Sequence, residues 1–155
     1  MKIKKLPVIS LHDGLDTIAG MFEGCDDIEE VAGFENVDNV YITESLFRHC
    51  ANLKVVHNIS FPNAEECQVM FASCRKLKHI GIIDLPKCKY AANMLDDCPE
   101  LVHIDSMNVG EVRGSGCPVD IDDASFGIRE VLPSADKHTQ ELILSIINTS
   151  ISNEK

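Results

Sequence analysis

The stretch MFASCRKLKHI, from Met70 to Ile80, recurs along the chain with different filler and the same spacing. The other copies are LFRHCANLKVV (46–56), MLDDCPELVHI (94–104) and MFEGCDDIEEV (21–31). Their central cysteines, Cys25, Cys50, Cys74 and Cys98, are 25, 24 and 24 residues apart. A fixed period of this size is typical of repeat proteins, in which each repeat packs against its neighbours.

The copies place apolar side chains in the same columns. Counted from the cysteine, positions −4, −3, 0 and +3 follow the spacing of one helix face, so we expect a short helix or tight helical turn in each repeat. Position +6 is apolar in every copy as well. The predicted structural core therefore consists of Met21, Phe22, Cys25, Ile28, Val31, Leu46, Phe47, Cys50, Leu53, Val56, Met70, Phe71, Cys74, Leu77, Ile80, Met94, Leu95, Cys98, Leu101 and Ile104.

Each later repeat continues with a short segment that contains β-branched residues: LKVVHNISF (53–61), LKHIGIIDL (77–85) and LVHIDSMNV (101–109). Such segments predict one strand per repeat, and the turn signals at Pro62 and Pro86 end the first two. Stacked copies would align these strands in a parallel sheet. We therefore expect an α/β solenoid of about four helix–strand repeats of 24–25 residues.

The column pattern resembles the BspA-type leucine-rich repeat over about residues 15–109. The resemblance implies a leucine-rich-repeat-like fold and activities of binding and adhesion rather than catalysis. Members of the family include bacterial surface adhesins, protist surface proteins and proteins encoded by phages and prophages. The phage and prophage members often end in a short helix, to which residues 140–150 are similar.

Both ends of the repeat array are expected to be caps. Residues 1–14 predict an N-terminal cap strand, 15–109 the solenoid, 110–133 an irregular capping segment and 134–155 a C-terminal helix and tail. Ser134 is the predicted helix cap, and the helix should run from about Ala135 to Asn148. Its apolar stripe either covers the last repeat or meets a partner, and the candidate partner-binding residues are Leu142, Ile143, Ile146 and Ile147.

The cysteine column has two interpretations. Free cysteine behaves as a small buried hydrophobe, and this packing role also fits Cys67 and Cys88, which share columns with apolar or small residues. The alternative is a series of disulfides between stacked thiols, in an extracellular particle. Cys117 lies outside the pattern.

Two groups of residues are candidate metal ligands. His79 and His103 share position +5, which places them on neighbouring strands facing the same way; the alternative is exposed polar residues on a sheet face. Asp120, Asp122 and Asp123 offer oxygen ligands for calcium, but their spacing does not match the 12-residue calcium loop, which favours a solvated acidic turn.

Composition excludes several classes of function. A net charge of −11 opposes binding to nucleic acid, and no stretch has the roughly 20 apolar residues of a membrane span. Pro7, His12 and Asp13 interrupt what would be a signal peptide, so we expect none. No phosphate loop, nucleophile elbow or zinc-protease motif is present, and we expect neither enzymatic activity nor a cofactor.

The sequence thus favours a non-enzymatic structural or interaction protein, most specifically a phage virion component that decorates or connects the capsid or tail. Its partners would be other virion proteins or copies of itself, and its location would be the virion or otherwise the cytoplasm. The alternative is an intracellular or surface-associated leucine-rich-repeat module that recognises a protein ligand. Charge is segregated between acids at 26–30 and bases at 75–89, as in a solvated face or a docking surface.

Overall fold

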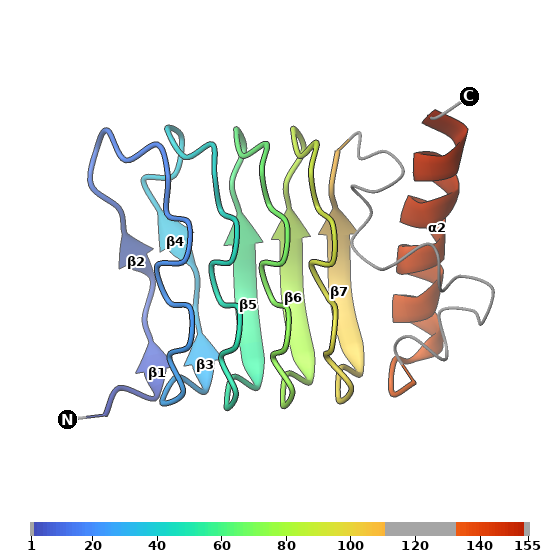
Figure 1. Cartoon of the computed structure of the whole chain (residues 1–155), viewed down its shortest axis with the longest axis horizontal. Coiled ribbons are helices and arrows are strands. Elements are labelled where there is room, and N and C mark those ends of the chain that lie inside the picture. The colour runs from blue at the N-terminus through green and yellow to red at the C-terminus, as the bar shows by residue number, and fades with distance from the viewer. Residues whose placement is uncertain (1, 111–132, 154–155) are drawn as a thin grey trace.

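The protein is a parallel solenoid of about four coils, followed by a C-terminal helix (Figure 1). The computed structural model describes residues 2–110 and 133–153. The solenoid and its terminal helix confirm the coarse architecture expected from the repeats. The elements are β1 (Lys5–Leu6), β2 (Ile9–Ser10), β3 (Glu30–Val31), β4 (Phe34–Glu35), β5 (Val55–Ser60), β6 (His79–Asp84), β7 (His103–Asn108) and α2 (Lys137–Asn153).

The main sheet has the strand order β1-β3-β5-β6-β7, and β2 and β4 form a second, two-stranded sheet. All pairs are parallel, and the register joins residues one repeat apart, such as Val55 with His79 and His79 with His103. The columns of the sequence are therefore rows of neighbours across the sheet.

Each coil bends at the middle of its strand. Val56 and Ile59 are both buried, whereas His57 and Asn58 between them face solvent. In the earlier coils the same bend separates β1 from β2 and β3 from β4. Gly81 occupies the bend of β6, where a Cβ atom would collide with the carbonyl oxygen of His57, so this position excludes every other residue type without a backbone shift.

The repeats carry turns in the place where a short helix or a tight helical turn was expected, so the helix–strand form of the repeat is not confirmed. Residues 2–110 contain no helix, and the segments 18–25, 43–50, 67–74 and 91–98, here called the turn segments, consist of consecutive turns. The N–H of Leu46 donates to the carbonyl of Thr43 at 3.2 Å, but the N–H of Phe47 donates to Met70 of the next coil at 2.9 Å. Bonds within a coil and bonds between coils alternate, which replaces the i→i−4 bonds of a helix.

Positive φ angles recur in these turns at fixed columns. Ser45 and His49 have φ of 59° and 60°, and Gly20 and Gly24 hold the equivalent places in the first turn segment with φ of 63° and 70°. Consecutive turns of this kind point positions −4, −3 and 0 inward, as a helix would. The apolar spacing therefore does not distinguish the two backbones.

The core is one continuous stack of side chains inside the coils. All the residues expected in the core from the three later repeats are buried. In the first repeat, Ile28 and Val31 are buried, and Phe22 and Cys25 are partly buried. Met21 differs, because it is 41% exposed. Met21 belongs to the first turn segment. Residues 2–17 supply the strands β1 and β2 but no turn segment, so the outer side of the first turn segment has no neighbouring turn segment to cover it.

The C-terminal helix begins at Lys137, two residues later than expected. Asp136 caps it by accepting the N–H of Thr139 at 2.9 Å, whereas the hydroxyl of Ser134 donates to the carbonyl of Pro99 at 2.8 Å. An aspartate at this position is a strong helix cap, so Asp136 takes the role expected of Ser134. Within the described chain, α2 lacks the length and apolarity that a membrane-crossing helix needs.

The apolar stripe of α2 faces the solenoid. Ile143 and Ile147 belong to the core with exposures of 0% and 5%, and Leu142 and Ile146 pack partly buried against it. Of the two roles expected for this stripe, the structure therefore shows the covering of the last repeat, and partner binding by these four residues stays a prediction. Leu144 lies on the outer side of the helix and is 42% exposed.

Candidate functional site

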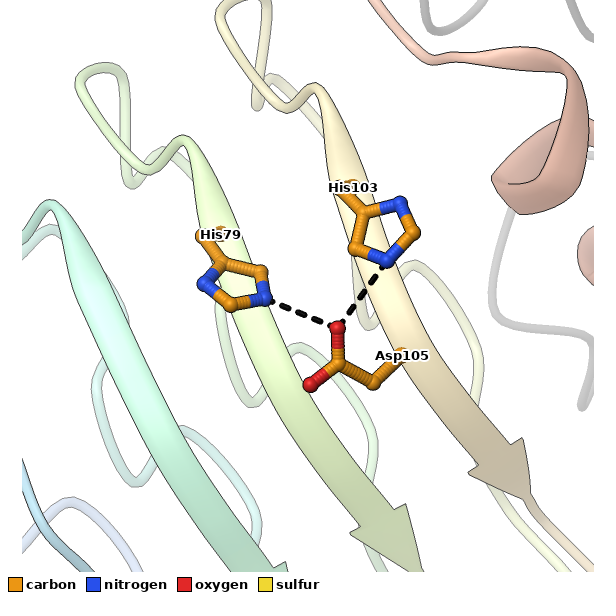
Figure 2. Close-up of side chains that lie close together, drawn as sticks. All are labelled: His79, His103 and Asp105. Carbon is orange, nitrogen blue, oxygen red and sulfur yellow. Dashed lines mark hydrogen bonds and ion pairs between the residues drawn. The ribbon is translucent and has the colours of Figure 1, made fainter.

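Polar side chains of β6, β7 and the start of α2 meet on the exposed face of the main sheet. His79 and His103 are direct neighbours in the register of β6 and β7. Asp105 lies two residues beyond His103 on the same strand, and both project to the solvent side because side chains alternate along a strand. Figure 2 shows the two imidazoles on adjacent strands, both directed toward the Asp105 carboxylate.

One oxygen atom of Asp105 lies between the two rings. Its Oδ1 is 3.0 Å from Nε2 of His79 and 2.9 Å from Nε2 of His103 (Figure 2). The ring centroids of the two histidines are 5.6 Å apart. The two nitrogen atoms and the oxygen all lie within 4.8 Å of one another.

Helix α2 supplies further contacts to the same cluster. Nδ1 of His103 donates to Oδ2 of Asp136, the helix cap, at 2.6 Å. The ring of His138 stacks on that of His103 with centroids 5.2 Å apart, and its Nε2 donates to the backbone carbonyl of Asp105 at 3.0 Å. The cluster therefore ties the end of the solenoid to the helix that covers it.

Backbone bonds reinforce this junction. The N–H of Asp136 donates to the carbonyl of Val102 at 2.8 Å, and the N–H of Ile104 donates to the hydroxyl of Thr139 at 2.8 Å. Ile104 belongs to β7, the last strand of the sheet, and Val102 directly precedes that strand. An unpaired edge strand is a template for association with other chains, and the start of α2 satisfies part of this edge.

The charges of the cluster stabilise one another. The hydrogen bond to Asp136 raises the pKa of His103, and the neighbouring Asp105 acts in the same direction. The hydrogen bond from His79 lowers the pKa of Asp105. The backbone N–H of Thr139, ahead of the contribution of His103, lowers the pKa of Asp136 to about 2.

The sequence predicted part of this site. It placed His79 and His103 on neighbouring strands and left open whether they bind a metal or are exposed polar residues. It missed Asp105, although a carboxylate two positions from His103 on one strand is a usable signal. It could not supply Asp136 and His138, which are more than 30 residues away along the chain.

The cysteine column is buried and forms hydrogen bonds. The thiols of Cys50, Cys74 and Cys98 each lie 3.1 Å from the carbonyl oxygen of a phenylalanine in the preceding coil, respectively Phe22, Phe47 and Phe71. Burial raises the pKa of Cys50 and of Cys98 to about 12, so both thiols keep the proton that they donate. The described cysteines are free, in agreement with the packing interpretation.

The acidic residues of the first repeat are largely paired. Lys4 and Lys54 both contact Glu29, each at 3.3 Å, and Glu30 accepts a hydrogen bond from His57 at 2.6 Å. These pairs join three successive coils on the sheet face. Cys117 and the acidic residues Asp120, Asp122 and Asp123, discussed above from the sequence, lie outside the described residues.

Comparison of the chain with known protein families, curated proteins and solved structures found no match.

Proposed function

We propose that the protein is a non-enzymatic structural component that acts through protein–protein contacts made by the exposed face of its main sheet. The observation that carries the proposal is the regular arrangement of side chains on that face. Equivalent side chains of successive coils lie side by side in register, at the spacing of parallel strands, about 4.8 Å. A rigid array of this kind presents a fixed pattern of charge to a partner.

The pattern along the face is uneven. At position +4, one residue before each strand of the main sheet, the row reads Lys4, Glu29, Lys54, Lys78 and Val102. Its first half is neutralised by ion pairs between neighbours, whereas Lys78 and Val102 are exposed at the other end. The exposed half lies beside the histidine and aspartate cluster, so this end of the face combines cationic, apolar and polar groups.

The partner surface proposed here differs from the one expected on α2. The apolar residues of that helix cover the last coil, so contacts through them would first require the helix to leave the solenoid. The sheet face needs no such rearrangement, which favours it as the docking surface.

We further propose that the repeats are of the BspA type and that the protein belongs to a phage virion, with another virion protein as its partner. The recurrent Phe-x-x-Cys-x-x-Leu columns and the terminal helix support this proposal. The runner-up is a leucine-rich-repeat binding module that recognises a protein ligand inside the cell or at its surface; the exposed parallel sheet favours it equally.

Site-specific photo-crosslinking tests the proposal. A photoreactive residue would replace Lys78, which is exposed directly before β6 of the sheet, and, as the matched control, Asp96, which is exposed on a turn segment. In purified particles from the native source, we expect Lys78 but not Asp96 to crosslink to one virion protein. Particles that lack the protein while the cell retains it would contradict the virion role, and equal crosslinking at both positions would contradict the sheet face as the contact surface.

A further inference from the structure

We propose that His79, His103 and Asp105 form a binding site for a divalent first-row transition-metal ion, with Zn²⁺ as the reference ion. Nε2 of His79, Nε2 of His103 and Oδ1 of Asp105 converge on one region above β6 and β7 (Figure 2). The proposal goes beyond the protein–protein contacts proposed above and does not depend on them.

The donor set fits this class of ion. Imidazole nitrogen binds zinc, copper, iron and nickel well, and two histidines with one carboxylate form a known zinc donor set. Calcium and magnesium prefer oxygen ligands, so the two imidazoles select against them.

The ligand atoms are already close to the distances that coordination requires. With zinc–ligand bonds of about 2.0–2.1 Å, ligand atoms in a tetrahedral site are about 3.3 Å apart. The two separations to Asp105 Oδ1, 3.0 and 2.9 Å, need an expansion of a few tenths of an ångström. In this structure, the imidazole nitrogens contact the carboxylate oxygen directly, and a bound cation would lie between these atoms.

Asp136 acts as the positioning residue of this site. Its contact with Nδ1 of His103 orients the imidazole so that Nε2 faces Asp105. A carboxylate on the far nitrogen of a metal-binding histidine fixes the ring and raises the basicity of the ligand atom. Because Asp136 caps α2, metal binding would strengthen the contact between the helix and the last coil.

The site is open to solvent. The side chains of His79, His103 and Asp105 are 41%, 36% and 53% exposed. A hydrated ion can therefore reach the ligands without a conformational change, and its remaining coordination positions would hold water.

Titration of the purified full chain with Zn²⁺, followed by calorimetry and by ¹H–¹⁵N correlation spectra of the imidazoles, tests the proposal. We expect saturable binding at one ion per chain, with Nε2 resonances of His79 and His103 shifting together and those of His57 unchanged. Mg²⁺ and Ca²⁺ at the same concentrations should leave the spectra unchanged.

Variants assign the ligands. His79→Ala and Asp105→Asn should each weaken Zn²⁺ binding at least tenfold. His57→Ala, which removes an exposed histidine from the neighbouring strand β5, is the matched control and should bind as the wild type does. Asp136→Asn keeps a helix cap, so α2 should persist by circular dichroism while affinity falls about 10–100-fold.

Three results would overturn the assignment: no Zn²⁺ binding by the wild type, binding that survives both His79→Ala and Asp105→Asn, or an equal response to Ca²⁺. Because His79 and Asp105 are exposed, loss of binding without loss of the folded spectrum identifies them as ligands rather than as structural residues.

Discussion

At the scale of the residue, the cysteine column is a hydrogen-bonding device as well as a packing one. Each thiol donates to a backbone carbonyl of the preceding coil, and that carbonyl also accepts an N–H from within its own coil. The carbonyl of Phe47, for example, accepts the backbone N–H of Cys50 and the thiol of Cys74. A small side chain that is apolar enough to be buried and still carries a donor meets both requirements. The structure therefore gives a reason for cysteine in this column that packing alone did not.

Cys74→Ala should lower the free energy of unfolding by about 1–2 kcal/mol, because it removes a buried sulfur and leaves the Phe47 carbonyl without its second donor. Cys74→Ser should cost no more than Cys74→Ala, since the hydroxyl still finds an acceptor. Chemical denaturation measures both. Cys25→Ala, in the first turn segment and only partly buried, is the control and should cost less. A serine variant clearly worse than alanine would show that apolar packing is the whole role of the column.

At the scale of the element, α2 caps the last coil of the solenoid. It satisfies part of the β7 edge, buries Ile143 and Ile147 against the last coil, and contributes Asp136 and His138 to the polar cluster. Solenoids need such ends, because a terminal coil otherwise exposes its core.

Two neighbouring residues of α2 separate capping from partner binding. Ile143→Ala removes a fully buried side chain and should destabilise the protein by about 2–5 kcal/mol. Leu144→Ala changes an exposed side chain of the same helix and should stay within about 0.5 kcal/mol of the wild type. Thermal or chemical denaturation gives the comparison. If Ile143→Ala kept full stability but lost association with a partner, the helix would be an anchor, as the sequence suggested.

The first strand should respond to acid. The hydrogen bond from His57, and then that from Lys5, lowers the pKa of Glu30 below its ordinary value. A depressed carboxylate pKa stabilises the folded state above the unfolded pKa, and this contribution is lost as pH falls through the folded pKa. Since Glu30 links β1 to β5 through these two partners, acidification through the lowered pKa of Glu30 should loosen β1 first.

Hydrogen exchange of the Ala32 amide, which donates to the Leu6 carbonyl at 2.9 Å, reports this loosening. Protection relative to a central amide such as that of Phe47 should fall on acidification. Glu30→Gln should remove part of the change, because the amide does not titrate, whereas Glu29, which pairs with Lys4, still does. Unaltered relative protection in the wild type would mean that backbone pairing alone holds β1.

At the scale of the whole molecule, stability comes from contacts between adjacent coils. Phe22, Phe47 and Phe71 stack along the coil axis with centroids 5.5 and 5.8 Å apart, and the ladder of backbone bonds follows the same direction. A change in one coil is therefore felt mainly by the coils on either side.

The sequence by itself determined the repeat, the parallel register of the strands, and which positions of the three later repeats point into the core. These follow from a period of 24–25 residues, because identical side chains stack when coils are joined at that spacing. His79 and His103 were found for the same reason: they occupy one column.

Tertiary structure decided the rest. The amides of the turn segments bond alternately within their own coil and to the next one, and apolar spacing cannot reveal an acceptor on another coil, so the sequence suggested helices. Met21 is exposed because of its place at the end of the stack, not because of its column. The cluster joining Asp105 to Asp136 and His138 exists because α2 folds back onto β7, a contact that no repeat period encodes.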